Sequence, residues 1–103
     1  FAWMADPSIH PDWQVLDVRH PKQATPFVEK FGKALWSSLP YEQVRDRYLE
    51  LPADKTLVIF CNAGSRSFEV QVFLDFVGQK NNLVLPGGFN VIRRMGADWL
   101  PVS

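Results

Sequence analysis

The chain has 103 residues, of which 47% are hydrophobic and 21% charged, and this length and composition fit one globular domain rather than a disordered chain, a collagen-like repeat or a charged tail. Eleven basic residues balance eleven acidic ones, so the formal net charge is zero and no global field attracts nucleic acid or an anionic membrane. Any anion must therefore be bound by a local site.

The first residues of the given sequence do not match the pattern of a signal peptide or a membrane span. It opens with Phe1 in place of methionine, and residues 1–4 are too short for the apolar segment of a signal peptide. The longest apolar runs, residues 1–5 and 57–61, are far shorter than the ~20 residues that span a bilayer. We expect residues 1–12 to form a leader segment, residues 13–103 to form the domain, the chain to be trimmed or part of a larger polypeptide, and its location to be cytoplasmic.

Three segments have strand patterns. Residues 13–18 are rich in β-branched and aromatic side chains and stop before Pro21, which disfavours helix in the preceding residue. Residues 57–60 form a continuous apolar run, typical of a central parallel strand covered on both faces. Residues 83–85, which stop at a Pro-Gly-Gly turn, predict a third and shorter strand.

Helical patterns lie between and after these strands. Apolar residues over 41–51 recur at i, i+3, i+7 and i+10, which predicts a helix with one solvated face. A second helix is predicted over 66–77, ended by Gly78, and we expect it to be largely buried against the sheet because few polar residues interrupt it. Residues 90–95 predict a short last helix. The apolar side chains of the 66–77 helix form two rows, Phe68-Val72-Phe76 and Val70-Leu74-Val77.

The alternation of strands and helices indicates β-α-β units. We therefore predict an α/β fold in which a parallel β-sheet is flanked by helices on both faces. In such sheets, ligands bind beyond the carboxyl ends of the strands. The candidate binding site is therefore the junction over residues 60–67, because there the most apolar strand leads into the most apolar helix.

That junction contains the single cysteine of the chain, which has no partner for an internal disulfide. A cysteine that ends a strand and precedes a helix lies near backbone N–H groups at the positive helix end, which favours the thiolate. Gly64 allows the loop to curl around the sulfur, and Ser65 or Ser67 can cap the helix or donate a hydroxyl. Arg66 adds a planar positive charge suited to an oxyanion. A lone cysteine is usually inert, but this surrounding favours a reactive thiol.

Three motifs carry a resemblance to a known family. Residues 61–67, Cys-Asn-Ala-Gly-Ser-Arg-Ser, are similar to the pattern Cys-x-Ser/Ala-Gly-x-Arg-Ser of single-domain rhodaneses. Residues 16–19, Leu-Asp-Val-Arg, followed by Pro21, resemble the early Asp-Val-Arg-x-Pro signature, and residues 85–89, Leu-Pro-Gly-Gly-Phe, resemble the late Leu-x-Gly-Gly turn. In order and spacing, the chain resembles a rhodanese-like sulfurtransferase of the single-domain type over roughly residues 13–101.

Three stretches depart from the family pattern. Residues 31–36 replace the frequent Gly-His-Ile-x-Gly-Ala segment, Ile92 stands where a tryptophan is common, and the tail over 96–101 is longer than usual. These differences lie outside the cysteine loop, and they leave the natural substrate and partner open.

The resemblance implies a chemistry and a set of residues. Sulfane sulfur would pass from a small sulfur-containing anion such as thiosulfate to Cys61, the nucleophile and persulfide carrier, and then to an acceptor such as cyanide or a thiol. Loop N–H groups would stabilise the thiolate and the persulfide, and Arg66 would hold the sulfonate oxygens. The residues expected to bind the substrate are Asn62, Ala63, Gly64, Ser65, Arg66 and Ser67.

The other chemistry-bearing residues are assigned structural roles. Asp17 and Arg19 are expected to form an ion pair that pins the first strand to the loop, and His10 and His20 are expected at solvated loop positions. One cysteine and two histidines at this spacing form no metal motif, so no metal and no cofactor are expected. Core or edge packing is expected for the tryptophans, Trp3, Trp13, Trp36 and Trp99.

Two alternatives stay open beside sulfur transfer. A cysteine-based phosphatase would have five residues between its cysteine and arginine, whereas this loop has four and places Ser67 at the phosphatase arginine position. The shorter loop favours sulfur over a tetrahedral phosphate. The second alternative is a non-catalytic rhodanese-like module that delivers sulfur or regulates within a larger protein. In none of these cases do we expect nucleic acid or a membrane as a partner.

Overall fold

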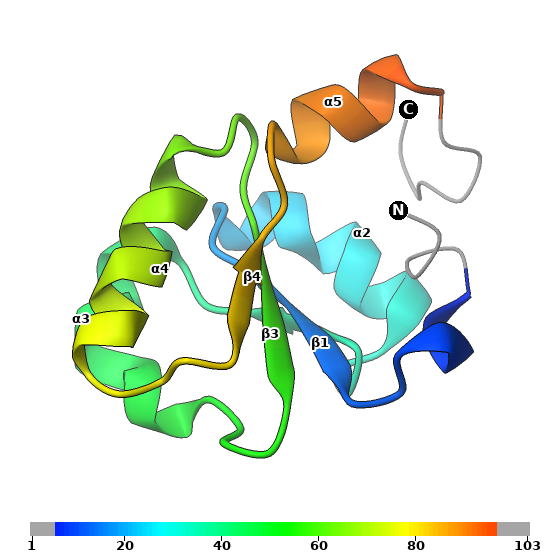
Figure 1. The fold of residues 1–103 in the computed structure, drawn as a ribbon. Helices are drawn as coiled ribbons and strands as arrows, with labels where there is room; N and C mark the ends of the chain where they lie inside the picture. The colour runs from blue at the N-terminus through cyan, green and yellow to red at the C-terminus, as the bar shows by residue number, and fades with distance from the viewer. Residues whose placement is uncertain (1–5, 97–103) are drawn as a thin grey trace.

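The computed structural model describes residues 6–96, which form an α/β domain with a parallel sheet between two layers of helices (Figure 1). The sheet has four strands in the order β2-β1-β3-β4, and every neighbouring pair is parallel. This is the fold class predicted from the sequence. The strands are β1 (Trp13–Asp17), β2 (Trp36–Ser38), β3 (Thr56–Phe60) and β4 (Asn82–Val84). The helices are η1 (Pro7–Ile9), α2 (Pro21–Phe31), η2 (Tyr41–Gln43), α3 (Val44–Arg47), η3 (Tyr48–Glu50), α4 (Ser65–Phe76) and α5 (Gly88–Arg94).

The strand order creates a switch point between β1 and β3. The two strands pair in register from Trp13 with Thr56 to Asp17 with Phe60, so their carboxyl ends lie at the same level. The chain leaves β1 through α2 and leaves β3 through α4, and these helices cover opposite faces of the sheet (Figure 1). Open α/β sheets bind their ligands at such a point, and Cys61 follows β3 directly.

Each face of the sheet has its own hydrophobic cluster. Because side chains alternate along a strand, Leu57 and Ile59 enter the cluster on the α3–α4 side, whereas Val58 and Phe60 enter the cluster on the α2–α5 side. Cys61 continues the alternation and belongs to the α3–α4 side. The continuous apolar run in β3 is thus explained by burial on both faces.

Three of the described elements were not predicted from the sequence: the short turn η1 within the expected leader segment, the helix α2 and the strand β2. In α2, apolar residues do recur at helical spacing, since Ala24 and Phe27 are buried and Phe31 is half-buried. Pro26 conceals this pattern, because proline is unfavourable inside a helix. Pro21 does more than end the strand before it, since it starts α2 at the first helical turn. β2 has only three residues, too few for a period-two pattern to be recognised.

The single helix predicted over residues 41–51 is wrong, because the segment forms two 3₁₀ turns, η2 and η3, on either side of the short α3. Its apolar face is nevertheless as predicted, with Val44 buried and Tyr41, Tyr48 and Leu51 packed against the core. Tyr41 and Val44, like Tyr48 and Leu51, are three residues apart, and residues at this spacing eclipse in a 3₁₀ turn.

The burial predicted for the 66–77 helix is correct for only one of its two apolar rows. Val70 and Leu74 of α4 are buried against the sheet, whereas Phe68, Val72 and Phe76 are exposed. A helix that packs on one side of a sheet can bury only one stripe. The second row is therefore left on the solvent side.

Asp17 and Arg19 form the predicted ion pair, and it is buried. The Asp17 carboxylate accepts hydrogen bonds from Nε and Nη2 of Arg19 at 3.0 and 2.9 Å, and from Nε1 of Trp36 at 2.9 Å. The guanidinium lies 4.8 Å from the centres of the Phe27 and Phe60 rings. The pair thus joins β1 to β2, α2 and β3.

The histidines and tryptophans have packing or capping contacts. His20 is exposed and, as the N-cap of α2, accepts a hydrogen bond from the Lys22 N–H. His10 is half-buried, and its ring stacks on the Trp13 ring with the ring centres 3.8 Å apart. Trp36 lies in the core as predicted, and Trp3 and Trp99 fall outside the described residues. Within residues 6–96, no helix combines the length and apolar character needed to cross a bilayer.

Replacing Asp17 with alanine should destabilise the domain by about 3–5 kcal/mol, because it leaves the buried Arg19 charge without its partner. Urea denaturation at pH 7 measures this loss, with Asp12→Ala, at an exposed position, as the matched control. A loss no larger than that of the control would contradict the structural role of the pair.

Candidate active site at the end of β3

The sulfur of Cys61 is surrounded by hydrogen-bond donors. The backbone N–H of Gly64 donates to Sγ at 2.9 Å, and the hydroxyl of Ser67 donates at 2.8 Å. Cys61 is only 4% exposed, and Ser67 is fully buried. The sulfur thus lies at the edge of the core but faces polar groups.

Gly64 gives the loop its curl. It is the N-cap of α4 and has φ +98°, in the left-handed region that favours glycine. Its N–H points back to the sulfur three residues earlier, while α4 starts at the next residue. The loop is therefore placed at the positive end of a 12-residue helix.

The turn at Gly87-Gly88 brings backbone donors to the carbonyl groups of the cysteine loop. The Phe89 N–H donates to the Cys61 carbonyl at 2.8 Å, and the Asn90 N–H donates to the Asn62 carbonyl at 2.9 Å. A Cβ on Gly88 would lie 2.1 Å from the Cys61 carbonyl oxygen, so only glycine allows this approach of α5. The sequence resemblance included the two glycines but did not indicate that they touch the cysteine loop.

The donors around Cys61 outweigh its burial. Burial raises the pKa of the thiol, whereas the Ser67 hydroxyl and the backbone N–H groups of Ser67, Gly64 and Ala63 lower it, and the balance is a pKa below the ordinary thiol value. These donors bind the negative sulfur better than the neutral one. The loop therefore favours the thiolate.

The other residues predicted for the site do not all reach the Cys61 sulfur. Ala63 and Ser65 are exposed at the mouth of the loop, and Ser67, not Ser65, is the serine that reaches the sulfur. The Arg66 guanidinium lies against η2, with its carbon 5.0 Å from the centre of the Tyr41 ring and Nη1 3.6 Å from the Glu42 carboxylate. Arg66 is thus near the loop in sequence, but its side chain is directed to a neighbouring element.

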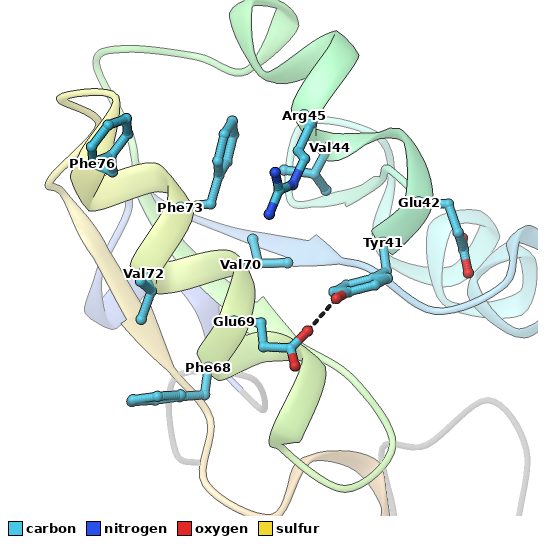
Figure 2. Close-up of a pocket in the computed structure, with 10 residues that line it drawn as sticks. All are labelled: Tyr41, Glu42, Val44, Arg45, Phe68, Glu69, Val70, Val72, Phe73 and Phe76. Carbon is cyan, nitrogen blue, oxygen red and sulfur yellow. Dashed lines mark hydrogen bonds between the residues drawn. The ribbon is translucent and has the colours of Figure 1, made fainter.

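A pocket of about 850 Å³, which the sequence did not predict, lies beside α4 (Figure 2). Its apolar lining includes Val44, Val70 and Phe73, and the Tyr41 hydroxyl donates to the Glu69 carboxylate across it. That hydrogen bond raises the pKa of Tyr41, so the phenol keeps its proton and remains the donor. The residues that form this link lie 28 positions apart, too far for a local pattern to reveal.

The described residues, 6–96, contain no group of three or more histidine, cysteine, aspartate or glutamate side chains able to hold a metal ion. The groups that contact the Cys61 sulfur are the Gly64 N–H and the Ser67 hydroxyl.

Several solved structures are similar to this chain. A rhodanese-related protein from Thermoplasma volcanium is 27% identical, with 89% of this chain and 88% of that chain covered and a TM-score of 0.71. An NAD-dependent persulfide reductase from A. fulgidus is 32% identical over 75% of this chain but only 13% of its own length, with a TM-score of 0.61. Reduced CoADR-RHD from Bacillus anthracis is 25% identical over 89% of this chain and 16% of its own, with a TM-score of 0.66.

This chain therefore corresponds to a small part of the two larger proteins. No curated protein matches it. The family model for the rhodanese-like domain matches residues 1–95, and the chain belongs to the rhodanese-like domain family.

Proposed function

We propose that this protein is a sulfurtransferase that carries sulfane sulfur as a persulfide on Cys61. The observation that supports this function most strongly is the pair of hydrogen bonds to Sγ, from the Gly64 N–H and the Ser67 hydroxyl. They favour a thiolate, which attacks without a separate general base. The same donors suit an anionic persulfide at the same position.

In the first step, the Cys61 thiolate attacks the outer sulfur of thiosulfate. The sulfur–sulfur bond of the donor breaks, sulfite leaves with the bonding electron pair, and Cys61 becomes a persulfide anion. In the second step, cyanide attacks the terminal sulfur of the persulfide. Thiocyanate leaves, and Cys61 returns to the thiolate, so no proton or external electron is needed in either step.

Arg66 is the residue we assign to the oxyanion of the donor. Its side chain is exposed, and its ion pair with Glu42 is exposed as well, so a sulfonate group competes for it at little cost. The contact with Tyr41 and Glu42 also turns the guanidinium toward η2. Arg66 therefore has to turn from η2 to reach a donor bound at Cys61, and the four-residue spacing between Cys61 and Arg66 is what favours sulfur transfer over phosphoester hydrolysis.

Replacing Cys61 with serine should abolish thiosulfate:cyanide sulfur transfer, by at least about 10³-fold, because the persulfide carrier is gone. Thiocyanate formation measures the rate, and mass spectrometry of the wild type after thiosulfate treatment should show one added sulfur atom on Cys61. Activity that survives in the variant would contradict the mechanism. A wild-type thiol that takes up no sulfur would favour a non-catalytic module.

Replacing Ser67 with alanine should move the reactivity of Cys61 with iodoacetamide to higher pH, because a hydrogen bond to the thiolate is lost. In the wild type, the lowered pKa puts the midpoint of the pH profile below that of a free thiol. Ser65→Ala, at an exposed position in the same loop, should leave the midpoint where it is. A wild-type midpoint equal to that of free cysteine would refute the activated thiol.

Replacing Arg66 with alanine should raise the KM for thiosulfate by about 10-fold or more, because a charge-assisted hydrogen bond to the donor is lost. Its effect on alkylation by neutral iodoacetamide should be small, since that reagent has no oxyanion. Arg94→Ala, an exposed arginine on α5, is the matched control. An unchanged KM would remove Arg66 from the donor site.

A further inference from the structure

One side of α4 exposes an apolar row that the fold does not use. The α4 row consists of Phe68, Val72 and Phe76, which are 60%, 55% and 88% exposed. Figure 2 shows these three side chains on one side of α4, whereas Glu69 and Phe73 lie on the side of Tyr41 and Arg45. All three side chains of the row also line the pocket beside α4. The sheet is covered by other residues of the helix, so the row adds nothing to the core described above.

The α4 row is continuous with the cysteine loop. Ser65, at the mouth of the loop, is followed at i+3, i+7 and i+11 by Phe68, Val72 and Phe76, which places all four on one helical stripe. Ser67, whose hydroxyl binds the Cys61 sulfur, immediately precedes Phe68. A molecule seated on the row therefore has one end beside the loop.

The two residues of α4 that border the row are acidic, although the Glu69 carboxylate accepts a hydrogen bond from Tyr41, the Asp75 carboxylate accepts one from Asn82, and Arg45 lines the pocket together with Glu69. Glu69 lies one residue after Phe68 and Asp75 one residue before Phe76, and α4 has no lysine or arginine after Arg66. On a helical projection these carboxylates flank the row on opposite sides. Such a surface complements an apolar segment with basic flanks, and it disfavours an anionic membrane.

The same charges and the size of the row disfavour a second copy of this chain. Two copies paired through the row would bring acidic borders together, a like-charge contact. The exposed side chains amount to roughly 400 Å², from about 150–250 Å² for each aromatic residue, well below the ~800 Å² per partner of a stable interface. An area of this size fits a transient contact with a protein partner.

We propose that the α4 row docks a protein acceptor of the persulfide sulfur, an apolar segment with flanking lysines or arginines that carries its cysteine at the end above the Cys61 loop. This rests on the proposed function. After the acceptor thiol loses its proton to solvent, its thiolate attacks the terminal sulfur of the persulfide. The sulfur–sulfur bond to Cys61 breaks, Cys61 leaves as the thiolate, and the acceptor becomes the persulfide.

The test uses synthetic amphipathic helical peptides with a leucine face and one terminal cysteine. One set has lysines beside the leucine face, a matched set has glutamates, and each set includes the cysteine at either end. Transfer from persulfidated protein to each peptide is compared with transfer to cyanide. We expect the best lysine peptide to be used at least about tenfold more efficiently, in kcat/KM, than its glutamate counterpart.

The double variant Phe68→Ser/Phe76→Ser should lose about tenfold or more of the efficiency toward the lysine peptide, because two aromatic contacts are removed. Its transfer to cyanide and its thermal unfolding should stay as in the wild type, since both side chains are exposed. Leu49→Ser, which removes an 85% exposed leucine from η3, is the control and should leave the transfer efficiency to the lysine peptide and to cyanide unchanged. Asp75→Asn should reduce the preference for the lysine peptide.

Binding of the same peptides with serine in place of cysteine, followed by fluorescence anisotropy, separates docking from chemistry. Binding that depends on the α4 row without any sulfur transfer would support docking and refute the proposed function. Cyanide transfer without peptide binding would refute docking alone. Docking would also be refuted if the wild type and the double variant used the peptides equally well. The same holds if the wild type forms a dimer, or binds anionic lipid vesicles, and the double variant does not.

Discussion

The buried ion pair between Asp17 and Arg19 connects the core of the domain to the cysteine loop. The Arg19 guanidinium packs on Phe60, the residue before Cys61, and lies 5.1 Å from the centre of the Phe89 ring. Phe89 in turn donates its N–H to the Cys61 carbonyl. A buried pair stabilises a fold only when its remaining groups are satisfied, and here Asp17 also binds Trp36 while Arg19 also donates to the Gln23 carbonyl. The charge pair thus fixes the segments on both sides of the Cys61 backbone.

The thiolate depends on a balance between burial and hydrogen bonding. Burial alone would raise the thiol pKa of Cys61, and the donors from the loop reverse this effect. They do so only if the loop holds its curled shape, which requires the left-handed Gly64 and the close approach of Gly88. The lowered thiol pKa therefore depends on the two glycine positions. A loop that is held rigidly in this shape needs no reorganisation during a reaction.

The junction around Cys61 was predictable because its signals are local. The continuous apolar run of β3 identifies a strand covered on both faces, and the residue that follows it must lie at the edge where ligands bind. Other features are concealed by a local exception to the pattern or depend on tertiary contacts. Pro26 concealed α2, and the direction of Arg66 is set by Tyr41 and Glu42, more than 20 residues earlier. Periodicity also identified two apolar rows on α4 without indicating which one faces the sheet.

The same helix contacts the cysteine sulfur and presents the surface proposed for docking. The first turn of α4 supplies the Ser67 hydroxyl to the sulfur, and its solvent side carries the α4 row. An acceptor bound along a helix axis has a fixed direction, so its thiol approaches the loop from one end rather than by random collision. Such orientation raises the effective concentration of the thiol near the persulfide. Because the row covers a small area, the proposed acceptor would also leave readily after taking the sulfur, as repeated transfer requires.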